Sequence, residues 1–80
     1  MKNAKKMFEK LGYGRHENYD ESGLYEIVYF KYNDYAPQIH FNLDHKCVMV
    51  CRKEYKASWF DKKILQAINK QVEELWGEEK

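Results

Sequence analysis

The sequence predicts one small α+β domain over residues 1–80, with a helix near each end and an antiparallel sheet between them. Apolar residues recur at helical spacing in the last quarter of the chain and, more briefly, near its start. Between these segments, β-branched and aromatic residues gather in runs that short polar links separate. We expect the order helix, three-stranded meander, helix, with both helices on one face of the sheet.

The first helix is short. Asn3 can cap its start and Gly12 can end it. Its apolar face comprises Ala4, Met7, Phe8 and Leu11. A helix this brief is not stable alone, so it must pack on the rest of the domain. Residues 14–23 are polar and turn-like, and a fourth strand at the sheet edge over residues 15–19 is an open alternative.

Residues 24–32, 38–43 and 46–53 are the expected strands, and Pro37 can only begin a strand or lie at an edge. A two-residue turn at Asp44-His45 pairs Phe41 with Val48 and Ile39 with Val50. A four-residue loop over 33–36 then pairs Val28 with Phe41 and Phe30 with Ile39. The face that the helices cover is therefore predicted to carry Leu24, Val28, Phe30, Ile39, Phe41, Val48 and Val50.

The same register gives the opposite face an unusually apolar character. Its residues would be Tyr25, Ile27, Tyr29, His40, Asn42, Cys47, Met49 and Cys51. Monomers seldom leave a large contiguous apolar patch open to water. Either the register is one residue off, or this face binds a partner through Tyr25, Tyr29, His40 and Met49. The partner would be another protein or a second copy in a homodimer.

The last helix is the clearest element, over residues 58–76. Ser58 can cap it, with Asp61 three residues on, and Gly77 can end it. Its apolar face comprises Phe60, Ile64, Ile68, Val72, Leu75 and Trp76. Ile68 lies in the middle of that face, so we expect Ile68→Ala to cost about 2–5 kcal/mol.

Two segments carry a family resemblance. Residues 7–13 read Met-Phe-Glu-Lys-Leu-Gly-Tyr, and residues 65–75 read Leu-Gln-Ala-Ile-Asn-Lys-Gln-Val-Glu-Glu-Leu. Together they resemble a family of short phage and prophage proteins of Gram-positive bacteria, which has no assigned activity. The chain departs from the family pattern where Leu75-Trp76-Gly77 replaces a closing Leu-Gly-Trp. The resemblance implies a phage-derived protein in the cytoplasm of a bacterial host, and it supplies no catalytic residue.

The charge distribution is not typical of two classes of protein. The formal net charge is +1, with basic and acidic stretches alternating along the chain. Neither a strongly basic nucleic-acid binder nor an acidic DNA mimic has this balance. No apolar run approaches the ~18–20 residues of a membrane span, so we expect a soluble protein without membrane contact.

Residues with zinc-ligand side chains gather at His40, His45, Cys47 and Cys51. The two cysteines lie four residues apart in a strand, about 13 Å at ~3.3 Å per residue, too far for a disulfide or a shared metal ion. A site built from His45, Cys47 and a residue elsewhere stays open, but no Cys-x-x-Cys pair anchors it. We therefore expect no metal and no other cofactor.

A catalytic arrangement of Cys47, His40 and Asp44 can be drawn, yet no phosphate loop, nucleophile elbow or helical zinc motif supports an enzyme. The leading hypothesis is a non-enzymatic binding protein that acts on a host or phage protein, for example as an inhibitor of a host defence component. The alternative is a nucleic-acid-binding accessory protein. It would use the basic segment 52–63, with Arg52, Lys53 and Lys56 as its patch.

Overall fold

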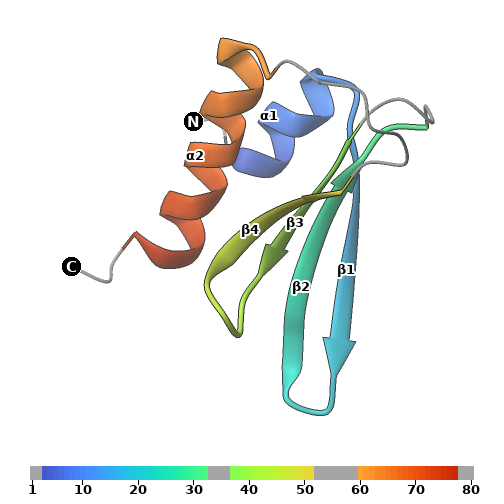
Figure 1. The fold of residues 1–80 in the computed structure, drawn as a ribbon, viewed down its shortest axis with the longest axis vertical. Helices are drawn as coiled ribbons and strands as arrows, with labels where there is room; N and C mark the ends of the chain where they lie inside the picture. Colours follow the sequence, from blue (N-terminus) through green and yellow to red (C-terminus); the bar gives the residue numbers. More distant parts are fainter. Residues whose placement is uncertain (1–2, 33–36, 52–59, 78–80) are drawn as a thin grey trace.

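The computed structural model describes residues 3–32, 37–51 and 60–77. In chain order the elements are α1 (Ala4–Lys10), β1 (Gly14–Asp20), β2 (Gly23–Phe30), β3 (Gln38–Asn42), β4 (Cys47–Cys51) and α2 (Lys62–Trp76). The strands form an antiparallel four-stranded sheet in the order β1-β2-β3-β4, and both helices lie on one side of it (Figure 1). The predicted α+β fold is confirmed, and the fourth strand that the sequence left open exists as β1.

The end of α1 sets the direction in which the chain enters the sheet. Asn3 caps the helix as predicted, accepting a 2.9 Å hydrogen bond from a backbone N–H of the first turn. At the other end Gly12 takes a left-handed φ of 88°. The backbone N–H of Gly12 donates a 3.0 Å hydrogen bond to the carbonyl of Glu9, and that of Tyr13 donates one of 3.0 Å to the carbonyl of Phe8. This pair of hydrogen bonds is a Schellman motif. The apolar contact that usually accompanies the motif is made here by Phe8 and Tyr13, which pack edge-on with 5.5 Å between ring centroids.

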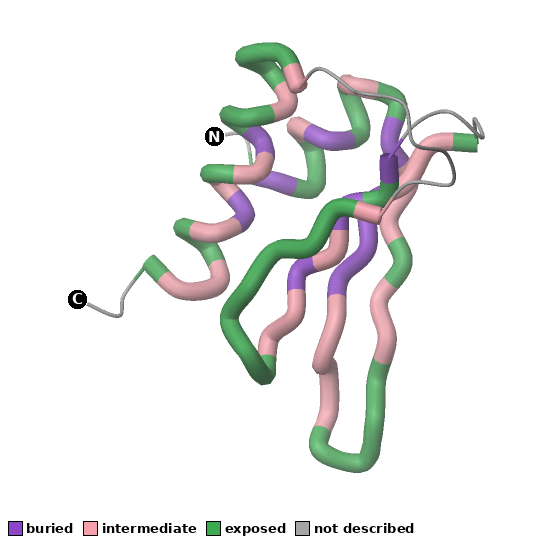
Figure 2. Tube along the Cα trace, in the orientation of Figure 1, coloured by how far each residue is buried: buried purple, intermediate pink, exposed green. Residues whose placement is uncertain are grey.

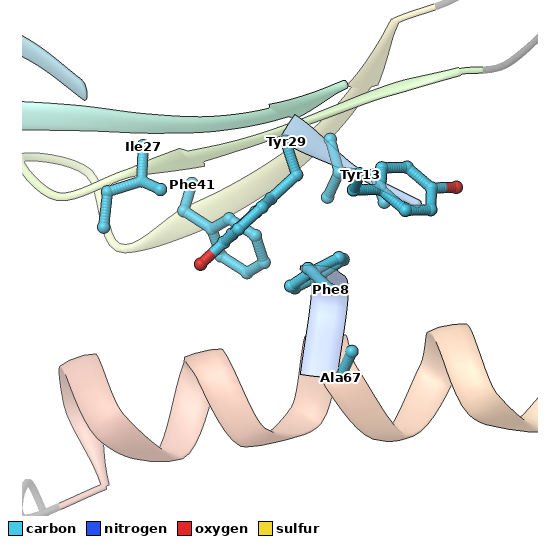
Figure 3. Close-up of a cluster of buried hydrophobic side chains, with 7 residues drawn as sticks. Phe8, Tyr13, Ile27, Tyr29, Phe41 and Ala67 are labelled. Carbon is cyan, nitrogen blue, oxygen red and sulfur yellow. The ribbon is translucent and has the colours of Figure 1, made fainter. Parts of the chain in front are cut away.

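The core lies between the sheet and the helices (Figure 3). Phe8 of α1 occupies its centre, stacked on Tyr29 with 3.8 Å between ring centroids and meeting Phe41 edge-on at 6.3 Å. Ala67 of α2 is fully buried in the same cluster. The buried members of this core cluster are Phe8, Tyr13, Ile27, Tyr29, Ile39, Phe41 and Ala67.

The predicted register is right for one hairpin and wrong by one residue for the other. Between β3 and β4, Phe41 pairs with Val48 and Ile39 with Val50, as predicted. Between β2 and β3, however, Phe41 pairs with Ile27 and Ile39 with Tyr29. Because side chains alternate across a strand, this shift turns over the part of β2 that pairs with β3, residues 26–29, together with the adjacent Phe30. Ile27 and Tyr29 face the helices, whereas Val28 and Phe30 belong to the opposite face.

Two local features favour the observed register. The Tyr29 ring is buried among core aromatics while its hydroxyl bonds to Arg15 and Gln71. Phe30 lies opposite Gly14 on β1, where the lack of a side chain leaves room for its ring. Of the other residues predicted to be covered, Leu24 does pack on the core cluster. Val48 and Val50 share that face but remain 36% and 45% exposed.

The helix α2 is shorter than predicted. It begins at Lys62, and the Asp61 side chain caps it by accepting a 3.0 Å bond from the Ile64 N–H. Ser58, the predicted cap, lies outside the described residues, as does the predicted loop 33–36. The helix ends at Trp76 before Gly77, as predicted. All members of the predicted apolar face pack on the core cluster: Phe60, Ile64, Ile68, Val72, Leu75 and Trp76.

Candidate functional site

The face of the sheet that points away from the helices is the candidate site, and we call it the open face. The register aligns one row of its side chains across all four strands: His16 pairs with Val28, Val28 with His40, and His40 with Met49. The parallel row beside it runs from Asn18 through Glu26 and Asn42 to Cys47. Both rows mix polar and apolar side chains.

A shallow depression of about 420 Å³ lies on the open face over β1, β2 and β3. It is lined by His16, Asn18, Glu26, Val28, Phe30, Gln38 and His40. Val28 is only 7% exposed and forms an apolar floor. The depression is therefore an apolar patch with polar side chains around it.

Glu26 is the electrostatic centre of the depression. Its carboxylate accepts a 2.7 Å hydrogen bond from the Asn18 amide and lies 3.0 Å from Nδ1 of His40. The hydrogen bond with His40, and secondarily the one from Asn18, lowers the pKa of Glu26 below its ordinary value of 4.5, against an opposing effect of burial. Glu26 is thus a fixed negative charge between two strands.

His40 connects the Glu26 carboxylate to Gln38, which lies two residues earlier in β3. Its Nε2 lies 3.1 Å from Oε1 of Gln38. An imidazole donates from both nitrogens only when it is doubly protonated. Either His40 is a cation that donates to both oxygens, or the Gln38 amide is turned so that its NH₂ group faces a neutral ring.

Phe30 gives the open face an aromatic surface. A Cβ atom placed on Gly14 would come within 2.9 Å of the Phe30 ring, so the ring lies directly over the glycine backbone. The ring also meets Tyr32 edge-on, with 5.3 Å between centroids. Phe30 is half-buried, and Tyr32 is 94% exposed. The glycine is what allows the tip of the ring to come this close, because a Cβ atom at position 14 would displace it.

The predicted partner-binding residues separate into two groups. His40 and Met49 do lie on the open face as a direct cross-strand pair, and Met49 is 52% exposed. Tyr29 was predicted there and is instead fully buried in the core, because of the register shift in β2. Tyr25 is the extra residue of a bulge opposite Tyr19, is half-buried, and is not among the residues that line the depression.

Sequence reasoning missed most of the depression, namely His16, Asn18, Glu26, Val28, Phe30 and Gln38. One signal could have found them. Gly14 comes directly before residues 15–19, the strand that the sequence left open, and a glycine facing a large aromatic ring is a common arrangement in antiparallel pairs. Pairing Gly14 with Phe30 fixes the β1–β2 register as far as the bulge after Asn18.

The proposed basic patch, Arg52, Lys53 and Lys56, lies outside the described residues. The described cysteines, Cys47 and Cys51, are both free thiols. Residues 3–32, 37–51 and 60–77 contain no group of three or more metal-ligating side chains. Over the same ranges, no helix is long and apolar enough to cross a membrane.

No protein-family model, curated protein or solved structure matches the chain. The resemblance to phage proteins therefore depends on the two sequence motifs alone.

Proposed function

We propose that this chain is a non-enzymatic binding protein and that the open face is its contact surface for another protein. The observation that carries the proposal is the row His16, Val28, His40 and Met49, which crosses the whole sheet on the side free of both helices. A rigid sheet positions these side chains, so the surface needs little ordering when it binds.

The chemistry of the open face supports a protein partner. Phe30 and Met49 belong to residue types that are enriched at the centres of interfaces. Glu26, with its two hydrogen-bond donors Asn18 and His40, provides a polar margin next to this apolar surface. An aromatic or aliphatic side chain of a partner would fit over Val28 and Phe30, while polar groups of the partner bond to Glu26 or His40.

The sequence resemblance extends the proposal to the identity of the partner. A phage-derived protein with this surface would act on a host or phage protein, and inhibition of a host defence component is one form of such action. This extension depends on the two family-like motifs, whereas the contact surface depends on the described residues.

Affinity capture with matched variants tests the proposal. Tagged wild-type protein, Phe30→Ala, Met49→Glu and Leu65→Glu would be expressed in a Gram-positive host during phage infection, cross-linked, and analysed by mass spectrometry. Leu65 is 47% exposed on α2 and thus controls for the helical side of the molecule. We expect wild type and Leu65→Glu to recover the same partner, and Phe30→Ala and Met49→Glu to lose it. Loss with Leu65→Glu alone, or no partner for any folded form, would refute the proposal.

A second candidate function is nucleic-acid binding through the basic segment 52–63. Lys62 and Lys63 are the last two residues of this segment, and they lie exposed at the start of α2 in the described part of the chain. Phosphate contacts release counterions, so the affinity should fall steeply with salt. Fluorescence anisotropy with labelled single- and double-stranded oligonucleotides at ~50 and ~200 mM salt tests this. Micromolar binding that is lost in Arg52→Ala/Lys53→Ala would favour it, and no binding at the lower salt would exclude it.

A further inference from the structure

The strand β4 is the most exposed apolar segment of the sheet. It is the last strand in the sheet order, and no described strand pairs with its outer edge. Val48, Met49 and Val50 are 36%, 52% and 45% exposed, and Figure 2 shows the strand green along nearly its whole length. Open edges of this kind are templates for pairing with another strand unless charge, proline or a bulge blocks them. None of these features lies within Cys47–Cys51.

The direction of the free backbone groups follows from the ladder. Leu43 donates a 2.9 Å bond to the carbonyl of Tyr25, so its backbone groups point toward β2. Alternation in an antiparallel sheet then points His40 toward β4 and its partner Met49 back toward β3. The backbone N–H and C=O groups of Val48 and Val50 are the ones that point outward.

The sequence of β4 is a palindrome centred on Met49: Cys47-Val48-Met49-Val50-Cys51. We propose that β4 pairs antiparallel with β4 of a second copy of this chain, about a two-fold axis at Met49. In this register Val48 lies opposite the partner's Val50 and exchanges both backbone hydrogen bonds with it. Met49 lies opposite the partner's Met49, and Cys47 opposite the partner's Cys51, at positions without backbone hydrogen bonds.

Self-complementarity is the reason to choose a second copy over another protein. In a two-fold interface, residue i of one copy lies opposite residue j of the other, and residue j of the first lies opposite residue i of the second. The palindrome places the same residue type at both members of each such pair, on both faces of the strand. On the helix side of the sheet, the exposed Val48 and Val50 would each contact the opposing valine of the partner and so be shielded from water.

The size of the contact predicts its strength. Pairing along a strand of five residues buries much less surface than a stable interface does, which is about 1,200–2,000 Å² in total. The dimer should therefore be weak, with dissociation in the micromolar range. It would join two sheets into one and place two copies of the open face side by side. This inference does not depend on the proposed function, since edge pairing requires only β4.

Cysteine cross-linking tests the register directly. Diamide oxidises two thiols to one disulfide and takes up the two hydrogen atoms as its hydrazine. Directly opposed residues in this register have Cα atoms about 4.5–5.5 Å apart, which suits a disulfide. We expect native wild-type protein to form a disulfide-linked dimer of twice 9.8 kDa. Cys47→Ser and Cys51→Ser should each fail alone, because identical cysteines would lie about 13 Å apart.

An equal mixture of Cys47→Ser and Cys51→Ser should recover the cross-link, since one chain then supplies Cys51 and the other Cys47. Cross-linking of either variant alone to the wild-type extent would overturn the register. Absence of the wild-type dimer at about 100 μM, well above a micromolar dissociation constant, would overturn the dimer.

Sedimentation velocity under reducing conditions provides a test without cysteine chemistry. Val50→Pro removes an outward N–H, which an edge strand tolerates. Val50→Ala retains that N–H and controls for the lost side chain. We expect a concentration-dependent dimer for wild type and for Val50→Ala, and a folded monomer at all concentrations for Val50→Pro. A folded Val50→Pro that dimerises like wild type would refute the pairing. If Val50→Pro does not fold, the cysteine mixture decides the question.

Discussion

The hydroxyl of Tyr29 donates a 2.5 Å hydrogen bond to Oε1 of Gln71, and this bond joins the centre of the sheet to α2. Gln71 is 3% exposed and is the buried polar side chain of the core. Arg15 in turn donates a 2.6 Å bond to the Tyr29 oxygen and pairs with Glu17 at 2.6 Å. Among the described residues, no buried side-chain nitrogen or oxygen lacks a partner. The polar layer at this end of the core is therefore fully satisfied.

Coupling between Tyr29 and Gln71 should be measurable by a double-mutant cycle. Tyr29→Phe removes the short bond and leaves the buried Gln71 oxygen with only the long 3.5 Å bond from Arg15, so it should reduce the free energy of unfolding by about 1–3 kcal/mol. Gln71→Met, which retains the volume, should also destabilise. The double variant should cost less than the sum of the two, by about 0.5–3 kcal/mol, in urea denaturation. Additive costs would mean that the bond contributes nothing to stability.

Placing a glutamate at Tyr29 or at Met49 distinguishes the two faces of the sheet. Tyr29 is fully buried, so Tyr29→Glu would bury an unpaired carboxylate and should unfold the domain. Met49 is 52% exposed on the open face, so Met49→Glu should change the free energy of unfolding by only about 0.5 kcal/mol. Circular dichroism and thermal melting would compare them. A cooperatively folded Tyr29→Glu would contradict the observed register and restore the one predicted from sequence.

The sequence predicted the elements better than it predicted their faces, and residues 24–32 show why. Apolar or aromatic side chains occupy both parities of this segment, so alternation alone cannot select the buried face. Tyr29 is buried because Arg15 and Gln71 satisfy its hydroxyl, and both partners lie far away in sequence. The β3–β4 hairpin lacks this ambiguity because Phe41 and Ile39 alternate with polar residues, and its register was predicted correctly.

The strand β1 and the buried positions of α2 were difficult to predict from the sequence, because polar or small residues occupy the faces that turn toward the core. The helix-facing side chains of β1 include Arg15 and Glu17, a polar pair that hides the usual strand alternation. In α2 the most buried positions are Ala67 and Gln71, neither of which marks an apolar face. Ile68, predicted to lie in the middle of that face, is half-buried. Ile68→Ala should therefore cost about 2 kcal/mol, the lower end of the predicted range.

The contact between the two helices predicts unequal effects for two adjacent glutamates. Oε2 of Glu74 accepts a 2.8 Å bond from the Ala4 N–H, so a residue of α2 caps the first turn of α1. Glu74→Ala should therefore cost about 0.5–2 kcal/mol, as loss of a cap does. The control is Glu73→Ala, which loses only an i,i+3 pair with Lys70 at 3.6 Å and should cost about 0.3–0.5 kcal/mol. Urea denaturation would compare them, and equal costs would contradict the capping role.

The Glu26–His40 pair predicts a loss of stability in acid. Hydrogen bonds with His40 and Asn18 lower the pKa of Glu26 in the folded state below 4.5, so the unfolded state binds its proton first as the pH falls. The stabilisation by the carboxylate is thus complete above its unfolded pKa and is lost as the pH falls through the folded pKa. Glu26→Gln cannot ionise, so its free energy of unfolding should decrease less than that of wild type between neutral pH and about pH 3. Urea denaturation across this range would measure the difference, and parallel pH curves for the two proteins would show that Glu26 is not stabilised in its charged form.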